Sequence, residues 1–467
     1  MKTHARNTLF FALGDTGTRL IGFLVTVYLA RVLGPSAFGV VSLGLAVLGY
    51  LAQLSGSGIQ LLEARNTAAE QEVDPQRVSS VVSVRLVLGA AIILIATAIS
   101  FLFVDSGETR DIVLLYALTL VPLALYIDWF FQGKERFEIL SVSKLVNSLI
   151  SAVVVWILIK GPDDLRFAPL ALLIGMFAAA CILIISYKRR YGSIRFEINP
   201  SSWADMFGRS LPVGFGMFVG QNAVNLGPIL VGWLFTSADV GMYSAGIKLI
   251  ILLLLLDRAV NSMYLPIVSR VRAARPEDLD RIVSVVLKVV VVIVIPLAIC
   301  CFVAADDIVG FLFGPGYEDA VTFLRILLGY FVLTIPNSVF MCTLVGSGKE
   351  LHYTRILITG SLLLAALVFV CAITIGPAGA AVGVVLGEFS MFVMLFSATK
   401  KVVLLRFLGL TAKPLVASVV MAVTAFAAQD WNTVAVLLLC LTMFIATLLA
   451  MGGLGRDDVQ FLRERLV

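Results

Sequence analysis

Fourteen apolar segments, most of them about 20 residues long, occupy most of this 467-residue chain. About 20 residues of α-helix cross the roughly 30 Å hydrocarbon layer of a bilayer, at about 1.5 Å per residue. Because lipid offers the backbone no hydrogen-bond partners, such segments are expected to cross as helices. We expect spanning helices over residues 8–30, 36–60, 78–104, 111–131, 139–160, 168–187, 208–234, 240–267, 282–304, 320–346, 354–375, 377–399, 413–429 and 431–451.

The composition agrees with an all-α integral membrane protein. The chain is 60% hydrophobic and 14% charged, whereas a soluble domain is roughly half apolar and about a quarter charged. Its six cysteines lie inside apolar runs without the spacing of a metal site, so we expect no metal and no cofactor. The first apolar run carries Asp15 and Arg19, which a cleavable signal peptide would avoid, so we expect it to remain as a spanning helix.

Lys and Arg residues fall mostly on one side of the predicted membrane, which indicates the orientation. With the N-terminus in the cytoplasm, 24 of them fall in cytoplasmic segments, and the opposite side carries only Arg31, Arg110, Lys160 and Arg166. An even number of helices with both termini in the cytoplasm follows. The same asymmetry accounts for the net charge of +5, so we expect no nucleic-acid partner.

Two short sequence matches recur at the same offset. Gly-Lys-Glu occurs at 133–135 and 348–350, and Gly-Pro occurs at 161–162 and 376–377, 215 residues later in both cases. Internal repeats in a polytopic membrane protein are typical of transporters, whose binding site lies where the repeats meet.

A third match extends the repeat to the start of each half. Residues 38–44 and 240–246 share Gly, Ser and Gly in register at an offset of 202. Six predicted helices separate these copies, so both halves have the same orientation, and we predict two parallel, pseudo-repeated six-helix lobes. The lobes are placed at 1–200 and 201–405, followed by an appended helix pair with a cytoplasmic tail at 406–467.

Several stretches carry a resemblance to a known family. Residues 129–136 (WFFQGKER) resemble the FQG-x-E junction of bacterial polysaccharide exporters, and residues 240–245 (VGMYSA) resemble their GxYSxA start of helix 8. Residues 313–320 (FGPGYEDA) are similar to their FGxxYxxA stretch, and residues 31–39 (RVLGPSAFG) also fit. In this order the motifs resemble the Wzx-type oligosaccharide flippases of the multidrug/oligosaccharidyl-lipid/polysaccharide exporter superfamily.

The resemblance implies a V-shaped exporter fold and a flippase of the bacterial cytoplasmic (inner) membrane. It implies a substrate of undecaprenyl-pyrophosphate-linked sugar repeat units, moved from the inner to the outer leaflet. Membrane lipids are expected partners, polysaccharide polymerase and co-polymerase proteins are candidate partners, and we expect a monomer. The sequence does not decide whether the polymer is O-antigen, capsule or exopolysaccharide, because no motif identifies a sugar.

Charges deep in a bilayer cost about 2.5–3.5 kcal/mol and usually face a cavity. Asp15 and Arg19 lie near mid-membrane and four residues apart, so they share a helix face and can pair. We expect Arg19 to contact the substrate's pyrophosphate, because a guanidinium matches phosphate oxygens, and Asp15 to orient it. The alternative is a structural ion pair that fastens the first helix to its neighbours.

The offset of 202 places Gln221 where the first lobe has Arg19. Three amides there, Gln221, Asn222 and Asn225, are candidates to hold sugar hydroxyls or to bond between helices. Lys248 lies too deep to reach the interface easily. It is a candidate second contact for the anion, or a partner for a carboxylate or a helix end.

Glu388 lies about halfway along its predicted helix. It is a candidate to bind H⁺ or Na⁺ and so to couple an ion gradient to transport; the alternative is a partner for Lys248. Asp257 and Arg258 are candidate gating residues on the inner side. Four cations nearer helix ends are expected to reach toward lipid head groups: Arg85, Lys144, Lys288 and Arg325.

Both Gly-Lys-Glu copies face the cytoplasm in the predicted topology. We expect each to form a tight turn with a charged cap rather than a phosphate site, because the glycine spacing of a P-loop is absent.

The main alternative function is a multidrug or cation antiporter of the same superfamily. It would favour acidic residues deep in the first lobe and usually twelve helices. A membrane polymerase or ligase would carry a long outer loop with catalytic residues, and the outer loops here are short. A scaffold in envelope synthesis is a further alternative. We therefore expect a transporter without catalytic residues and not an enzyme.

Overall fold

The structure, a computed structural model, describes residues 2–56, 58–70, 74–103, 107–220, 222–404, 407–428 and 431–452. Side chains are described for these residues except 2–13, 217, 220, 222–224 and 407–410. The described residues are helical apart from turns and connecting segments, which confirms the all-helical prediction. The chain divides into two compact units, Met1–Ser244 and Ala245–Val467.

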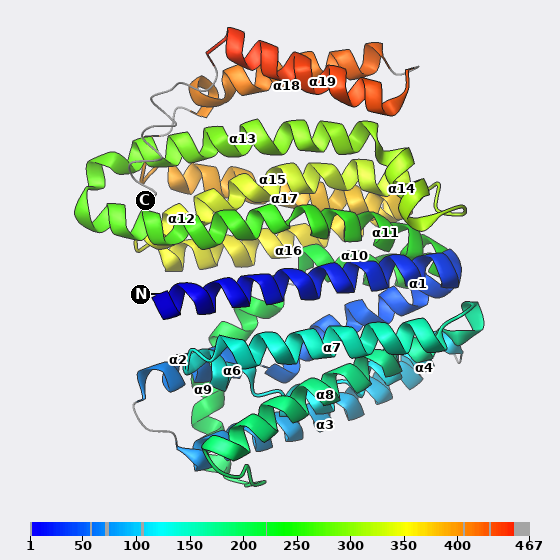
Figure 1. Cartoon of the computed structure of the whole chain (residues 1–467), viewed down its shortest axis with the longest axis vertical. Coiled ribbons are helices and arrows are strands. Elements are labelled where there is room, and N and C mark those ends of the chain that lie inside the picture. The colour runs from blue at the N-terminus through cyan, green and yellow to red at the C-terminus, as the bar shows by residue number, and fades with distance from the viewer. Residues whose placement is uncertain are drawn as a thin grey trace. The chain divides into compact units, whose positions relative to one another are not determined.

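The first unit contains ten α-helices among its described residues and shares an eleventh with the second unit (Figure 1). Their bounds are α1 Lys2–Gly56, α2 Ile59–Ala69, α3 Pro75–Phe103, α4 Glu108–Ala117, α5 Leu120–Leu125, α6 Asp128–Gly133, α7 Phe137–Leu158, α8 Phe167–Arg190, α9 Pro200–Gly220, α10 Asn222–Leu234 and the shared α11 Ser237–Leu253, with a 3-10 turn, η1, at Pro162–Asp164. Helices α7 and α8 run side by side.

The second unit continues from α11 with eight further α-helices among its described residues. Their bounds are α12 Leu255–Ala274, α13 Leu279–Val303, α14 Ala305–Phe313, α15 Ala320–Gly346, α16 Glu350–Ile375, α17 Pro377–Thr399, α18 Phe407–Ala427 and α19 Thr433–Ala450, with a 3-10 turn, η2, at Pro276–Asp278. Helices α16 and α17 pack together, and the α18–α19 pair packs on α13.

Eleven helical segments among the described residues are long and apolar enough to cross a membrane. They lie at Gly14–Gly56, Pro75–Leu102, Glu108–Gly133, Phe137–Leu158, Phe167–Arg190, Ser237–Ala274, Pro276–Val303, Ala320–Gly346, Glu350–Ile375, Pro377–Thr399 and Thr433–Ala450. Two shorter apolar helices, Asn225–Leu234 and Thr411–Ala427, overlap the predicted spans 208–234 and 413–429. The protein is therefore a multi-pass membrane protein.

The first two predicted helices are joined in α1, with a kink at Gly34. Gly34 has φ 73° and ψ 172°, and Pro35 follows it directly. Proline supplies no N–H to the helix and disfavours a helical conformation in the residue before it, while glycine tolerates the positive φ. The predicted gap between residues 30 and 36 is therefore a kink rather than a loop.

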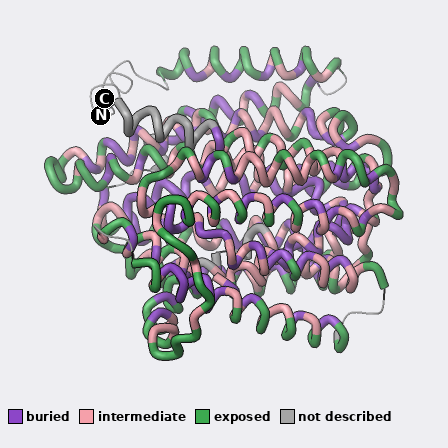
Figure 2. The backbone as a smooth tube through the Cα atoms, turned by 60° about the horizontal axis from the view of Figure 1, so that its bottom comes forward, coloured by how far each residue is buried: buried purple, intermediate pink, exposed green. Residues whose placement is uncertain are grey.

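Many large apolar side chains are exposed on the helices. Figure 2 marks exposed residues along the backbone tube, and they recur along many of the helices. Leu94 is 70% exposed, Leu102 is 76% exposed and Phe426 is 76% exposed. Monomeric soluble proteins rarely expose extended apolar patches, so these side chains fit contact with lipid.

An aromatic cluster packs α6 against its neighbours in the first unit. Trp129, Phe130 and Phe131 are buried, and the Phe130 ring lies edge-on to the Tyr187 ring with centroids 4.9 Å apart. The WFFQG motif thus supplies core residues, and its polar end forms the turn into α7.

Arg85 does not reach the lipid head groups, contrary to the expectation from its position in the sequence. Its side chain is buried and donates hydrogen bonds to the carbonyl oxygens of Tyr126 (3.1 Å) and Leu123 (2.6 Å). The helical path is broken between α5 and α6, after Pro122, where carbonyls lose their usual i+4 donors. Arg85 supplies a donor to Tyr126 O and a second donor to Leu123 O, which also accepts the Tyr126 N–H at 3.3 Å.

Candidate functional site

A polar cluster lies where α1 and α7 pack closely together. A Cβ at Gly14 would lie 2.8 Å from the Cβ of Ser141, so the glycine permits this approach. The contact brings Lys144 of α7 to Asp15 of α1, one residue beyond Gly14.

Asp15 binds two cations at once. Arg19 Nε lies 2.7 Å from Asp15 Oδ2, and Lys144 Nζ lies 3.5 Å from Asp15 Oδ1. The three side chains are about equally accessible: 30% exposed for Arg19, 29% for Asp15 and 27% for Lys144. The predicted pairing of Asp15 with Arg19 is present, and Lys144, expected at the head groups, joins them.

This cluster, Asp15–Arg19–Lys144, carries one net positive charge. Arg19 uses Nε for Asp15, and its terminal nitrogens have no hydrogen-bond partner among the described residues. A guanidinium presents several N–H donors in one plane. The cluster can therefore donate to an anionic group while Asp15 holds Arg19 in place.

The other predicted substrate contacts are spread over both units. Lys248, in the second unit, is half-buried on α11 and pairs with no described residue. Asn225, in the first unit, packs over Gly49, where a Cβ would lie 2.7 Å from its Nδ2 atom. Gln221 lies outside the described residues, and the side chain of Asn222 is not described.

Glu388 is buried in the second unit and hydrogen-bonded to α15. Asn337 Nδ2 donates to Glu388 Oε1 at 2.7 Å and to the Glu388 carbonyl oxygen at 3.3 Å. The Asn337 Oδ1 atom is buried and has no hydrogen-bond partner among the described residues. No ion pair joins Glu388 to Lys248, so the carboxylate has an amide partner rather than the lysine considered from the sequence.

Asp257 belongs to a second polar group against the same helix. Asn261 Nδ2 donates to Asp257 Oδ2 at 3.0 Å and to Ser338 Oγ at 3.3 Å. Ser338 follows Asn337 on α15, so Asp257 and Glu388 both connect to this short stretch of one helix. The sequence analysis did not identify the α15 residues. Pro336 beside them could have drawn attention to this part of the helix, because a proline inside a helix removes one backbone N–H donor. Arg258 is exposed and forms no ion pair with Asp257.

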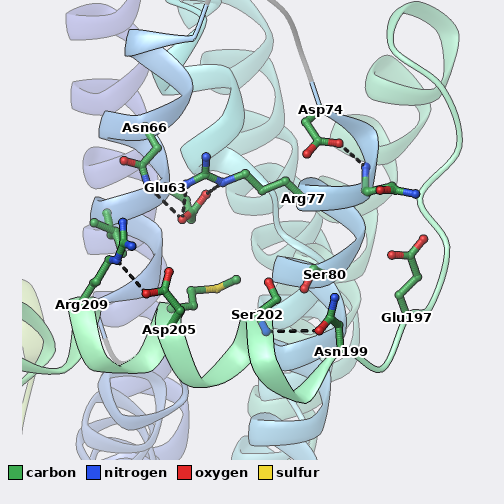
Figure 3. A pocket seen from close by; sticks show the side chains of 13 residues that line it. Glu63, Asn66, Asp74, Arg77, Ser80, Glu197, Asn199, Ser202, Asp205 and Arg209 are labelled. Carbon is green, nitrogen blue, oxygen red and sulfur yellow. Dashed lines mark hydrogen bonds and ion pairs between the residues drawn. The ribbon is translucent and has the colours of Figure 1, made fainter.

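An acidic cavity of about 380 Å³ lies between α2, α3 and α9 (Figure 3). Arg77 Nε lies 2.7 Å from the buried carboxylate of Glu63, and Arg77 also pairs with Glu70. Lys134, from the Gly-Lys-Glu turn, donates to the Glu70 carbonyl oxygen at 2.8 Å. Lys134 and the nearby Arg77 are therefore already bound, whereas Arg136, directly after the tripeptide, is exposed.

The two Gly-Lys-Glu copies use their glycines differently. Gly133 ends α6 with no room for a side chain, since a Cβ would lie 2.7 Å from the Ala64 carbonyl oxygen. The left-handed residue of this turn is Glu135, at φ 54°. Gly348 has open space around it and is itself left-handed, at φ 74°. Both copies form turns, as expected, but the left-handed residues are not the aligned ones.

Spanning helices that carry a cationic cluster and buried carboxylates define a multi-pass membrane transporter. Residues 4–272 match the family described as "Polysaccharide biosynthesis protein". Because the match covers more than half of the chain, the protein belongs to this family, and the resemblance to Wzx-type flippases is confirmed.

Known proteins agree with this assignment. A candidate O-antigen transporter of Escherichia coli (strain K12) is 23% identical over 397 residues, covering 81% of this chain and 92% of the relative. The structure of the lipid II flippase MurJ in an inward closed conformation matches with a TM-score of 0.78 at 14% identity, covering 98% of this chain and 100% of that one. A multidrug resistance MATE family transporter of the MOP superfamily, inward-facing, matches with a TM-score of 0.65 at 16% identity, covering 82% and 96%. These structural likenesses show the fold.

Proposed function

We propose that the protein is a flippase that carries undecaprenyl-pyrophosphate-linked oligosaccharide repeat units from the cytoplasmic to the outer leaflet, for surface polysaccharide synthesis. The observation that carries this proposal is the Asp15–Arg19–Lys144 cluster, half-exposed within two spanning helices. Two cations beside one carboxylate suit a pyrophosphate, which brings negative charge into a region where an unpaired charge is costly. The names of the Escherichia coli relative and of MurJ support a lipid-linked substrate.

The proposed architecture has fourteen spanning helices with both termini in the cytoplasm, which places the protein in the bacterial inner membrane. Residues 1–200 and 201–405 form two pseudo-repeated six-helix lobes, and 406–467 hold the appended pair and tail. The kink at Gly34 supports a division of the long Gly14–Gly56 segment into two crossings. The shorter apolar helices Asn225–Leu234 and Thr411–Ala427 support crossings near 208–234 and 413–429.

In this mechanism the lobes rock between inward-facing and outward-facing states. Arg19 and Lys144 hold the pyrophosphate, Asp15 orients Arg19, and Lys248 contributes a second anion contact. The absence of a described partner for Lys248 supports that role, because an unpaired lysine in a spanning helix is costly without an anion or water beside it. Gln221, Asn222 and Asn225 hold sugar hydroxyls.

We propose that Glu388 couples transport to a gradient of H⁺ or Na⁺. A buried carboxylate that accepts from an amide is partly neutralised by its donor, and binding a cation would complete its neutralisation. The unpartnered Asn337 Oδ1 is a further oxygen near this position. Asp257 and Arg258 serve in gating on the inner side.

A multidrug antiporter of the same superfamily is the weaker proposal. A cationic drug would meet a net positive charge at Asp15–Arg19–Lys144, whereas an anionic lipid head group would be attracted.

Substitution of Arg19 tests the flippase function directly. Arg19→Ala should abolish surface polysaccharide in cells that depend on this protein, with normal amounts of the variant in the membrane. Arg189→Ala, which removes an exposed cation at the end of α8, is the matched control and should leave polymer at the wild-type amount. A wild-type amount of surface polysaccharide in the Arg19→Ala strain would contradict the assignment of Arg19 to substrate binding.

A further inference from the structure

A basic cavity lies beside the second Gly-Lys-Glu turn, between the start of α16 and the end of α17. It has a volume of about 500 Å³, and Lys349, Arg355 and Lys401 line it together with His352 and Glu350. None of the three cationic side chains forms a hydrogen bond or ion pair with another described residue. With His352 neutral, three positive charges and one negative charge border the cavity.

The start of α16 adds to this positive field. Helix α16 begins at Glu350, directly after Lys349, and no side chain caps its first turn. The free N–H groups at a helix N-terminus and the positive end of the helix dipole attract anions. The cavity thus combines three unpaired cations with an uncapped helix start.

The first Gly-Lys-Glu turn provides an internal comparison. There Lys134 is held by the Glu70 carbonyl oxygen, and Arg77 is held by Glu63 and Glu70. The acidic cavity between α2, α3 and α9, which Arg77 lines, has four carboxylates and two guanidinium groups around it. The same tripeptide therefore lies in opposite electrostatic surroundings. The lysine of the first copy is bound to a backbone carbonyl oxygen, whereas Lys349 of the second copy is available for a ligand.

The position of the cavity favours a lipid over a soluble anion. It lies where the apolar segment Ala320–Gly346 ends and Glu350–Ile375 begins. Because spanning helices end near the membrane surface, we place the cavity at the level of lipid head groups. Leu351, in its lining, is 78% exposed and offers an apolar contact beside the cations. Basic pockets between spanning helices on the cytoplasmic side commonly bind anionic lipid head groups.

We propose that this cavity binds the phosphate of an anionic phospholipid head group. In the orientation proposed above the lipid belongs to the cytoplasmic leaflet. Binding itself requires no transport, so a failure of the flippase proposal would leave this site untouched.

The test uses the purified full-length protein in phosphatidylcholine nanodiscs with increasing fractions of phosphatidylglycerol, and bound lipid is counted by native mass spectrometry. The variant K349A/R355A/K401A should lose affinity for phosphatidylglycerol by about fivefold per cation. The control K188A/R189A/R190A removes the same number of exposed cations at the end of α8 and should bind as the wild type does. Equal losses in both variants, or no loss in the first, overturn the proposal.

Two further measurements distinguish a loss of binding from a folding defect, and a lipid ligand from a soluble phosphate. The charge-conserving variant K349R/K401R should keep phosphatidylglycerol binding, and loss of binding in this folded variant would contradict a purely electrostatic site. Inorganic phosphate at millimolar concentration should not displace the lipid. Displacement that depends on the same three cations would mean that the ligand is a soluble phosphate and that the lipid assignment is wrong.

Discussion

Gly39 and Gly241 meet in a reciprocal backbone contact within the first unit. A Cβ at Gly39 would lie 1.7 Å from the carbonyl oxygen of Ser237, and a Cβ at Gly241 would lie 2.1 Å from the carbonyl oxygen of Pro35. Gly39 and Gly241 are 202 residues apart, as are Pro35 and Ser237, and this is the offset of the sequence repeat. Such a self-complementary contact is typical of elements related by a two-fold axis, so it favours the repeat as a structural relationship.

We predict that Gly39→Val and Gly241→Val both prevent this approach of the two helix starts. Overpacking a close contact costs about 1–3 kcal/mol or more, and here the obstacle is backbone, which cannot rotate away. The variants should show a lower melting temperature and less protein in the membrane. Gly22→Ala, on the same helix α1 but with open space around it, is the control and should match the wild type. Equal stability of all three variants would argue against the contact.

Lys144 should be as important for transport as Arg19. Lys144→Ala removes one of the two cations around Asp15, and we expect at least about a tenfold fall in transport, since a charge-assisted hydrogen bond contributes about 1.5–3 kcal/mol. Lys144→Arg should restore most of it. Lys160→Ala, just beyond the end of the same helix and exposed, is the control. Transport is measured with a labelled lipid-linked oligosaccharide in proteoliposomes, and full activity of Lys144→Ala would restrict recognition to Arg19.

The sequence was sufficient to predict the Asp15–Arg19 pair, because side chains four residues apart on a helix lie next to each other on the same face. Lys144 could not be predicted in the same way. Its contact with Asp15 depends on the close packing of α1 on α7 at Gly14 and Ser141, which is set by tertiary structure rather than by local spacing.

In general, the sequence could not predict contacts between residues that lie far apart along the chain. Glu388 was recognisable as a deep carboxylate, but its partner Asn337 lies 51 residues away on α15, and nothing in either helix alone identifies the pair. Arg85 was misplaced for a related reason. Its distance from the helix end suggested the membrane surface, whereas the carbonyls released between α5 and α6 hold it inside.

Glu388→Gln should separate ion coupling from folding. The amide keeps the shape of the side chain and removes its charge, so we expect a folded protein whose transport no longer responds to an imposed H⁺ or Na⁺ gradient. Glu318→Gln, which changes an exposed loop carboxylate, is the control and should respond as the wild type does. The measurement is uptake into proteoliposomes with each gradient applied separately. A Glu388→Gln variant that still follows a gradient would place coupling elsewhere.

Asn337→Ala should destabilise the second unit rather than only change transport. It leaves the buried Glu388 carboxylate without its 2.7 Å donor, and an unsatisfied buried group costs about 1–3 kcal/mol, or more when charged. We expect a lower melting temperature that the double variant Asn337→Ala/Glu388→Gln partly restores, because the second change removes the unpaired charge. Additive losses in the double variant would show that the two side chains do not interact.

Arg85 is predicted to be a structural residue of the first unit. Arg85→Ala leaves the Tyr126 carbonyl oxygen without a donor among the described residues, at a cost of about 1–3 kcal/mol for an unsatisfied buried group. It also removes the 2.6 Å bond to the Leu123 carbonyl oxygen, which keeps only the Tyr126 N–H at 3.3 Å. Arg85→Lys should recover only part of the loss, since one ammonium replaces a planar fork that reaches two oxygens. Arg136→Ala, at an exposed arginine before α7, is the control. Melting temperatures measured in detergent should be highest for the wild type and Arg136→Ala, lower for Arg85→Lys and lowest for Arg85→Ala. An Arg85→Ala protein as stable as the wild type would mean that water can replace the guanidinium at this break in the helix.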